Sequence, residues 1–124
     1  MKSPSPPGIF PVRSFNVRME KSAYEPFIGQ MRKFGETFGF RMVIKPSSPL
    51  PYDMFFQMFR HDVELDAANG SDTGAADLTF GIGFYPAKGQ PPPSPETLVP
   101  LVDGLRHFMA EVPSASVTDV TQSR

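Results

Sequence analysis

The spacing of apolar residues changes twice along this chain of 124 residues, and this change limits the folds that the chain can adopt. Apolar residues recur at helical intervals in residues 22–38, alternate between two sets in residues 40–85, and return to helical intervals in residues 98–112. Helical intervals predict amphipathic helices, and alternation predicts strands with one buried face. The pattern therefore predicts an α+β chain in which two helices flank a run of strands.

Four strands are predicted between the two helices, and the links between them are mostly short. Neighbouring strands with short links pair antiparallel, because a parallel pair needs a crossover of about a dozen residues or more. Each helix has a single apolar stripe, so we expect both helices to cover the same face of the sheet in a two-layer sandwich. The predicted order is α-β-β-β-β-α, and residues 9–19 form either an additional N-terminal strand or an extended lead-in along an edge. The four predicted strands are Phe40–Lys45, Asp53–Phe59, Val63–Ala67 and Leu78–Tyr85.

The chain is long enough for one domain that is held together by its own core. A chain of 13.7 kDa buries about two-thirds of its extended surface on folding. The sequence has no Cys, so it contains no disulfide, no thiolate zinc site and no cysteine nucleophile. Residues 1–8, mostly Ser, Pro, Lys and Gly, are predicted to be a flexible arm, and residues 9–113 a single α+β domain. Residues 114–124 follow a proline that ends the second helix and are predicted to be a flexible tail.

The charges nearly balance and give the chain no overall attraction to nucleic acid or to an anionic membrane. The 12 Lys and Arg residues against 13 Asp and Glu residues leave a formal net charge of -1, so we expect no nucleic-acid partner. No apolar stretch approaches the roughly 18 residues of a membrane span, and we expect none. The first residues lack the apolar segment of a signal peptide. The default location is the cytoplasm, with export as the alternative if a leader has been removed.

Alternate residues of a strand point to opposite faces of its sheet, so each predicted strand divides into two sets. One set is uniformly apolar and predicts the core beneath the helices. The other set mixes aromatic, charged and small residues, and we expect the helices to leave it uncovered. We predict this second face to be the binding surface. Its candidate residues are Arg41, Val43, Lys45, Phe55, Gln57, Phe59, Gly81, Gly83 and Tyr85.

Two features of this second face favour a binding function. It is more apolar than a solvated sheet face needs to be, and exposed apolar patches mark partner or ligand surfaces. Gly81 and Gly83 weaken their strand, which indicates that a backbone, an aromatic ring or a ligand approaches closely there. The alternative is that residues 9–17 or the C-terminal tail fold over this face.

Neither a catalytic motif nor a metal or cofactor motif emerges from the sequence. Residues 61–66 hold the one tight group of titratable side chains, but in a strand His61 diverges from the three acids that follow it. No nucleophile motif accompanies that histidine. Residues 81–83 lack the third glycine and the following helix of a nucleotide-binding loop. We therefore predict no catalytic residue, no metal site and no cofactor.

The sequence thus favours a small non-enzymatic binding module whose uncovered sheet face engages a protein partner, with a second copy of the chain as one candidate for a homodimer. The charged residues expected to set the register of that contact are Arg41, Lys45, Glu64 and Asp66.

The alternative hypothesis is a small-molecule-binding domain or a modest enzyme. Its site would lie near the glycine-containing strand of residues 78–85, with His61 and Tyr85 as acid–base groups. A protein partner predicts a flat surface, whereas this alternative predicts a deep pocket.

Overall fold

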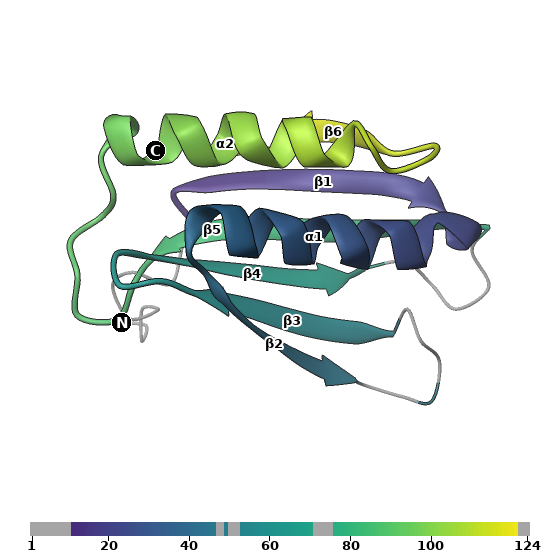
Figure 1. Ribbon diagram of the computed structural model, residues 1–124, viewed down its shortest axis with the longest axis horizontal. Coiled ribbons are helices and arrows are strands. Elements are labelled where there is room, and N and C mark those ends of the chain that lie inside the picture. The colour runs from purple at the N-terminus through teal and green to yellow at the C-terminus, as the bar shows by residue number, and fades with distance from the viewer. Residues whose placement is uncertain (1–10, 47–48, 50–52, 71–75, 122–124) are drawn as a thin grey trace, which may run out of the picture.

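The structure of the chain is a computed structural model, which describes residues 11–46, 49, 53–70 and 76–121. The described residues follow the order β-α-β-β-β-β-α-β, with a short 3-10 helix directly before the first α-helix (Figure 1). The predicted N-terminal arm, residues 1–8, lies outside the described residues. The elements are β1 (Arg13–Glu20), η1 (Lys21–Ala23), α1 (Tyr24–Phe38), β2 (Arg41–Pro46), β3 (Met54–Phe59), β4 (Val63–Asn69), β5 (Asp77–Pro86), α2 (Pro95–Met109) and β6 (Ser116–Asp119).

The strands join in one six-stranded antiparallel sheet with the order β2-β3-β4-β5-β1-β6. The α+β class, the antiparallel sheet and the two α-helices are therefore confirmed. The expected number of about four strands is wrong, because β1 and β6 extend the sheet beyond β5 (Figure 1). The predicted order α-β-β-β-β-α is wrong for the same reason: one strand precedes the first helix and another follows the second helix.

β1 lies inside the sheet and not along its edge. Its side chains Phe15, Val17 and Met19 are at most 1% exposed, and each lies opposite a buried residue of β5. β5 pairs with one side of β1 and β6 with the other. The option of an additional N-terminal strand is therefore the one that the structure adopts, at a central position.

β6 forms within the segment that the sequence predicts to be a flexible tail. Val117 packs against the core, and Arg13 Nη2 lies 2.7 Å from Asp119 Oδ2. The backbone N–H of Ser14 donates to Thr121 Oγ1 at 3.0 Å, just beyond the strand. One partly buried apolar side chain and several polar contacts with β1 thus hold this segment at the edge of the sheet.

The two helices begin and end where the local chemistry allows. α1 ends at Gly39, whose φ of 79° is the left-handed conformation that glycine adopts at helix ends. α2 begins after Ser94, whose side chain accepts a hydrogen bond from the Thr97 backbone N–H at 3.3 Å. Within the described part of the chain, no helix is long and apolar enough to cross a membrane.

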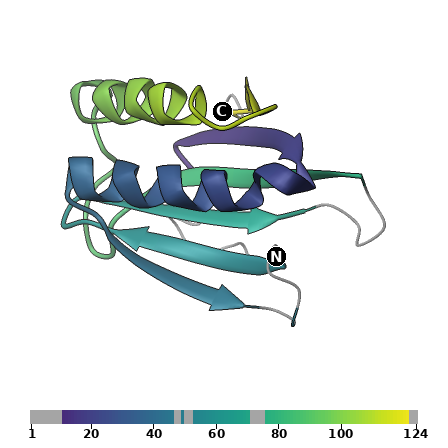
Figure 2. The same cartoon turned by 45° about the vertical axis from the view of Figure 1, so that its right-hand side comes forward.

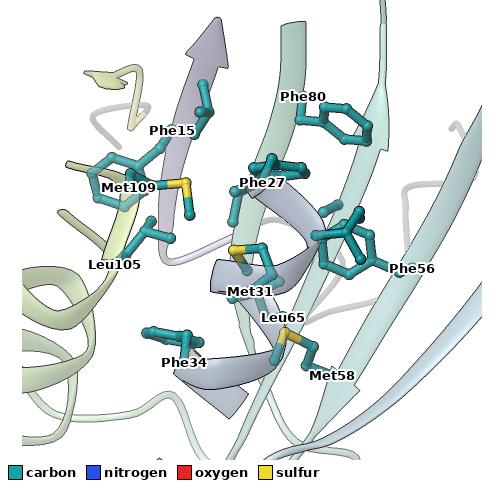
Figure 3. Packing of buried hydrophobic residues seen from close by; sticks show 14 of the residues in the cluster. Phe15, Phe27, Met31, Phe34, Phe56, Met58, Leu65, Phe80, Leu105 and Met109 are labelled. Carbon is teal, nitrogen blue, oxygen red and sulfur yellow. The ribbon is translucent and has the colours of Figure 1, made fainter. Parts of the chain in front are cut away.

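Both helices lie on the same face of the sheet, and aromatic side chains join the two layers (Figures 1 and 2). The ring centroid of Phe27 on α1 lies 4.6 Å from that of Phe80 and 6.1 Å from that of Phe56, both on the sheet (Figure 3). On the same helix, the Phe34 ring meets the Phe108 ring of α2 edge to face at 6.2 Å. These contacts fix α1 against both the sheet and α2.

Replacement of the central aromatic ring tests this account of the core. Phe27→Ala is expected to lower the free energy of unfolding by about 3–5 kcal/mol, because it removes a fully buried ring and leaves a cavity between α1 and the sheet. The matched control is Val99→Ala on α2, where the side chain is 53% exposed and the change should stay within about 0.5 kcal/mol. Chemical denaturation followed by circular dichroism measures both values, and equal effects would contradict the assigned core.

Acid is expected to weaken the side-chain contacts of Asp119, at the end of β6, in a defined range of pH. Hydrogen bonds from the Thr121 side chain and backbone, followed by one from Arg13, lower the pKa of Asp119 from 3.8 to about 2. Because the folded pKa is the lower one, these contacts stabilise the chain above pH 3.8, and their contribution is lost as the pH falls toward 2. An NMR titration of the Asp119 carboxyl carbon measures the midpoint, and Thr121→Val should raise it. An unchanged midpoint in that variant would contradict the assigned contacts.

Candidate functional site

All nine candidate binding residues lie on the sheet face away from α1 and α2, which we call the open face. Along its strand, each alternates with residues that pack in or against the core. The strands that carry them are joined edge to edge through β4. The structure thus brings together Arg41, Val43 and Lys45 from β2, Phe55, Gln57 and Phe59 from β3, and Gly81, Gly83 and Tyr85 from β5.

The segments considered as a cover for the open face lie within the sheet where they are described. Residues 13–17 belong to β1, and residues 116–119 form β6. Residues 9 and 10 are not among the described residues. Pro11 does reach the face, because its Cβ lies 3.2 Å from the position that a Cβ on Gly83 would take. Over most of their described length, therefore, these segments widen the open face instead of covering it.

The half of the open face on β2 and β3 carries large side chains, and cations lie over two aromatic rings there. The Arg41 guanidinium lies 5.0 Å from the centroid of the Phe59 ring, and the Lys45 ammonium lies 5.9 Å from that of the Phe55 ring. Such cation–π contacts hold both partners in place at a partly exposed surface. We call these four residues together with Val43 the ridge.

The half of the open face next to the ridge is hollowed. A cavity of about 340 Å³ lies over β4, β5 and β1, and we call it the hollow. Among the residues that line it are two of the smallest on the open face, Ala68 and Gly81. Around it lie Phe55 from the ridge, Asp66, Tyr85 and Val120.

The two glycines of β5 serve different purposes. A Cβ on Gly83 would lie 2.9 Å from Cε1 of Tyr85, so the tyrosine ring itself fills the space beside this residue. A Cβ on Gly81 would meet only Asn16 Oδ1, at 3.8 Å. The close approach of an aromatic ring that the sequence indicated is therefore found at Gly83, whereas Gly81 borders open space.

Two ionisable side chains, Asp66 and Tyr85, border the hollow, and burial raises the pKa of both. Burial raises the pKa of Asp66, while a hydrogen bond from Gln57 and the charge of Lys45 oppose this shift. The Gln57 Nε2 atom lies 3.3 Å from Asp66 Oδ1. Burial also raises the pKa of Tyr85, and the negative charge of Asp66 adds to the effect. The tyrosine hydroxyl therefore stays protonated at neutral pH and can donate a hydrogen bond.

The structure does not bring His61 to this site. Its side chain is 87% exposed in the turn between β3 and β4, and it does not line the hollow. Asp62 beside it is held by Arg60 at 2.6 Å, and that hydrogen bond is the main reason why the pKa of Asp62 is lowered. Across the described residues, no group of three or more His, Cys, Asp or Glu side chains could hold a metal ion.

Several residues that line the hollow were not among the sequence-based candidates. Ser14 and Asn16 reach it from β1, and Val120 reaches it from the chain just after β6. A signal for the first two is present, because they alternate with the buried Phe15 and Val17. Their position next to β5 has no such local signal, since the β1–β5 pairing joins distant parts of the chain.

Comparison of the chain with protein-family models, with curated proteins and with solved structures finds no significant match. The geometry of the open face is therefore the basis for the functional argument.

Matched substitutions at the two glycines test their different roles. Gly83→Ala is expected to lower the free energy of unfolding by about 1–3 kcal/mol, because the new Cβ overlaps the Tyr85 ring. Gly81→Ala is expected to raise it by about 0.5–1 kcal/mol, because alanine fits a strand interior better than glycine and finds free space here. Urea denaturation of both variants measures the difference, and a reversed order would contradict the described position of Tyr85.

Proposed function

We propose that this protein is a small non-enzymatic binding module whose open face takes a protein partner. The observation that carries this proposal is the arrangement of the layers. Both helices lie on the other face, while β1 and β6 extend the sheet at its far side. Phe55 and Phe59 on β3 and Tyr85 on β5 are therefore left partly exposed, with β4 between them. Clustered apolar side chains that remain exposed on a folded domain are typical of interaction surfaces.

The charges on the open face indicate which class of partner surface would complement it. Arg41 and Lys45 lie on β2, and Glu64 and Asp66 lie two strands away on β4. A partner surface that carries both signs of charge around apolar groups would match this pattern. A nucleic-acid backbone is a poorer match, because the two acids share the face with the two basic residues and would repel its phosphates.

The small-molecule alternative has one observation in its favour. The hollow, at about 340 Å³, is at the lower end of the roughly 300–1,000 Å³ range of small-molecule sites. Catalysis there has less support, because His61 lies away from the rim and leaves Tyr85 without the proposed acid–base partner. We therefore favour binding of a protein over binding of a small molecule, and binding over catalysis.

A pair of matched aspartate substitutions tests the proposed function. Phe59→Asp places a charge in the ridge, and Val99→Asp places the same charge on an exposed position of α2. The full chain and both variants are used to capture proteins from a cell extract, and each captured protein is then purified and titrated against them. We expect affinity to fall at least about tenfold for Phe59→Asp and to stay unchanged for Val99→Asp.

Circular dichroism of both variants checks that they remain folded. Tyr85→Ala provides a second variant of the open face that introduces no charge. If Phe59→Asp and Tyr85→Ala both stay folded and alter neither partner affinity nor self-association, the open face is not the binding surface and the proposal fails. NMR shifts confined to the hollow in a screen of small molecules would favour the alternative.

A further inference from the structure

The open face consists of two neighbouring halves of opposite shape. Within one row across the sheet, Lys45 pairs with Phe55, Phe55 with Ala68, and Ala68 with Gly81. Two large side chains of the ridge are thus followed by two of the smallest residues, which line the hollow. The ridge and the hollow are therefore adjacent and in register.

The two halves also differ in charge. The ridge carries Arg41 and Lys45, neither of which forms an ion pair with another described residue. The neighbouring strand β4 carries Glu64 and Asp66 on the same face. Each acid accepts one hydrogen bond of 3.3 Å, from the Lys88 backbone N–H and from Gln57 respectively. Carboxylates have several acceptor positions, so both acids keep the capacity to bind a cation.

We propose that the partner of the open face is a second copy of this chain, related by a two-fold axis that runs parallel to the strands between β3 and β4. This inference rests on the proposed function and names its partner. A half-turn about that axis exchanges β2 with β5 and β3 with β4. Phe55 then faces Ala68 of the other copy, and Lys45 faces Gly81 of the other copy. The ridge of each copy thereby enters the hollow of the other, and each contact occurs twice.

The same half-turn brings opposite charges together. Arg41 faces Tyr85 of the other copy, which pairs with Glu64 on the adjacent strand. Lys45 lies over Gly81 of the other copy. Asp66 of that other copy is a diagonal neighbour of its Gly81, on the adjacent strand β4 and one row along, so Lys45 comes close to it. Sheets that pack face to face lie about 10 Å apart, a distance at which these side chains interdigitate.

Other positions of the axis fit less well. An axis along β4 would place Glu64 on Glu64 and Asp66 on Asp66, and like charges brought together in an interface repel. An axis along β3 would place Phe55 on Phe55 and leave the hollow unfilled. The axis between β3 and β4 is thus the one that satisfies both shape and charge.

The size of the contact predicts its strength. Four strands about 4.8 Å apart, each with about six residues at about 3.3 Å, present a face of roughly 20 by 20 Å. The area of such a face, about 400 Å², is smaller than the roughly 800 Å² that each partner buries in a standard stable interface. We therefore expect a dimer whose population depends strongly on protein concentration.

Charge reversal provides the decisive experiment. Solution mass is measured by light scattering and sedimentation over a concentration series for the full chain, for Lys45→Glu and for Asp66→Lys. The unaltered chain should approach twice the monomer mass, and each variant alone should dimerise at least about tenfold more weakly, because like charges meet across the interface. In an equal mixture of the two variants both contacts pair opposite charges, so the dimer should return.

The mixture separates contacts between copies from contacts within one copy. Any repulsion within a single variant chain persists in the mixture, whereas repulsion between chains is relieved only if Lys45 of one copy meets Asp66 of the other. Gly81→Val should abolish the dimer by filling the hollow, while the monomer remains folded because a Cβ there meets only Asn16 at 3.8 Å. Thr118→Val, on β6 outside the four overlapping strands, is the control that should keep the dimer.

A monomer at every concentration would overturn this inference, and so would a mixture in which the dimer does not return. If the chain stays monomeric while Phe59→Asp still removes binding of another protein, the proposed function stands and the second copy is ruled out as its partner. If a dimer forms and neither Gly81→Val nor the charge reversals weaken it, the dimer uses another surface and the inference fails.

Discussion

The pairing of β1 with β5 is the contact on which the rest of the structure depends. Strands β2 to β5 follow one another along the chain and lie side by side in the same order, whereas β1 comes from before α1 and β6 from after α2. The pairing places Phe15 opposite Ile82 and Val17 opposite Phe80, so the apolar side chains of both strands lie beneath the helices. Without this ladder, β6 would have no neighbour and α2 would lose part of the surface that it covers.

The same pairing explains why no described segment forms a third layer on the second face of the sheet. A chain of this length has few segments that could form a third layer, and the structure uses two of the candidates as strands. The sheet is therefore wide, and the shape and charge of its second face depend on the side chains of the strands themselves. Large residues on β2 and β3, and the small Ala68 and Gly81 on β4 and β5, give that face its two halves. At their border Asp66 accepts a hydrogen bond from Gln57.

Local spacing in the sequence was sufficient for the helices, the strands β2 to β5 and the face that each side chain occupies. It was not sufficient for β1. In residues 9–19 the apolar Phe10 and Val12 stand at even positions and Phe15 and Val17 at odd positions, so the alternation that predicts a strand is imperfect. Its central position depends on pairing with β5, which no local pattern encodes. β6 has a single partly buried apolar residue, Val117, and its order depends on Arg13 far away in the sequence. A pocket beside the strand of residues 78–85 was one of the two alternatives, but its β1 side could not be predicted for a related reason, since it needs β1 beside Gly81.

The position of β1 also has a consequence for how the chain is made. Arg18 and its partner Asp77 are 59 positions apart, and Arg13 and Asp119 are 106 positions apart, so β1 leaves the ribosome long before either of its neighbours in the sheet. Until then its two edges lack partners, and an unpaired apolar strand readily joins strands of other chains. The hairpins of β2 to β5 need only nearer contacts and can form sooner. Residues 13–20 are therefore the segment of this chain that is made longest before its neighbours in the sheet exist.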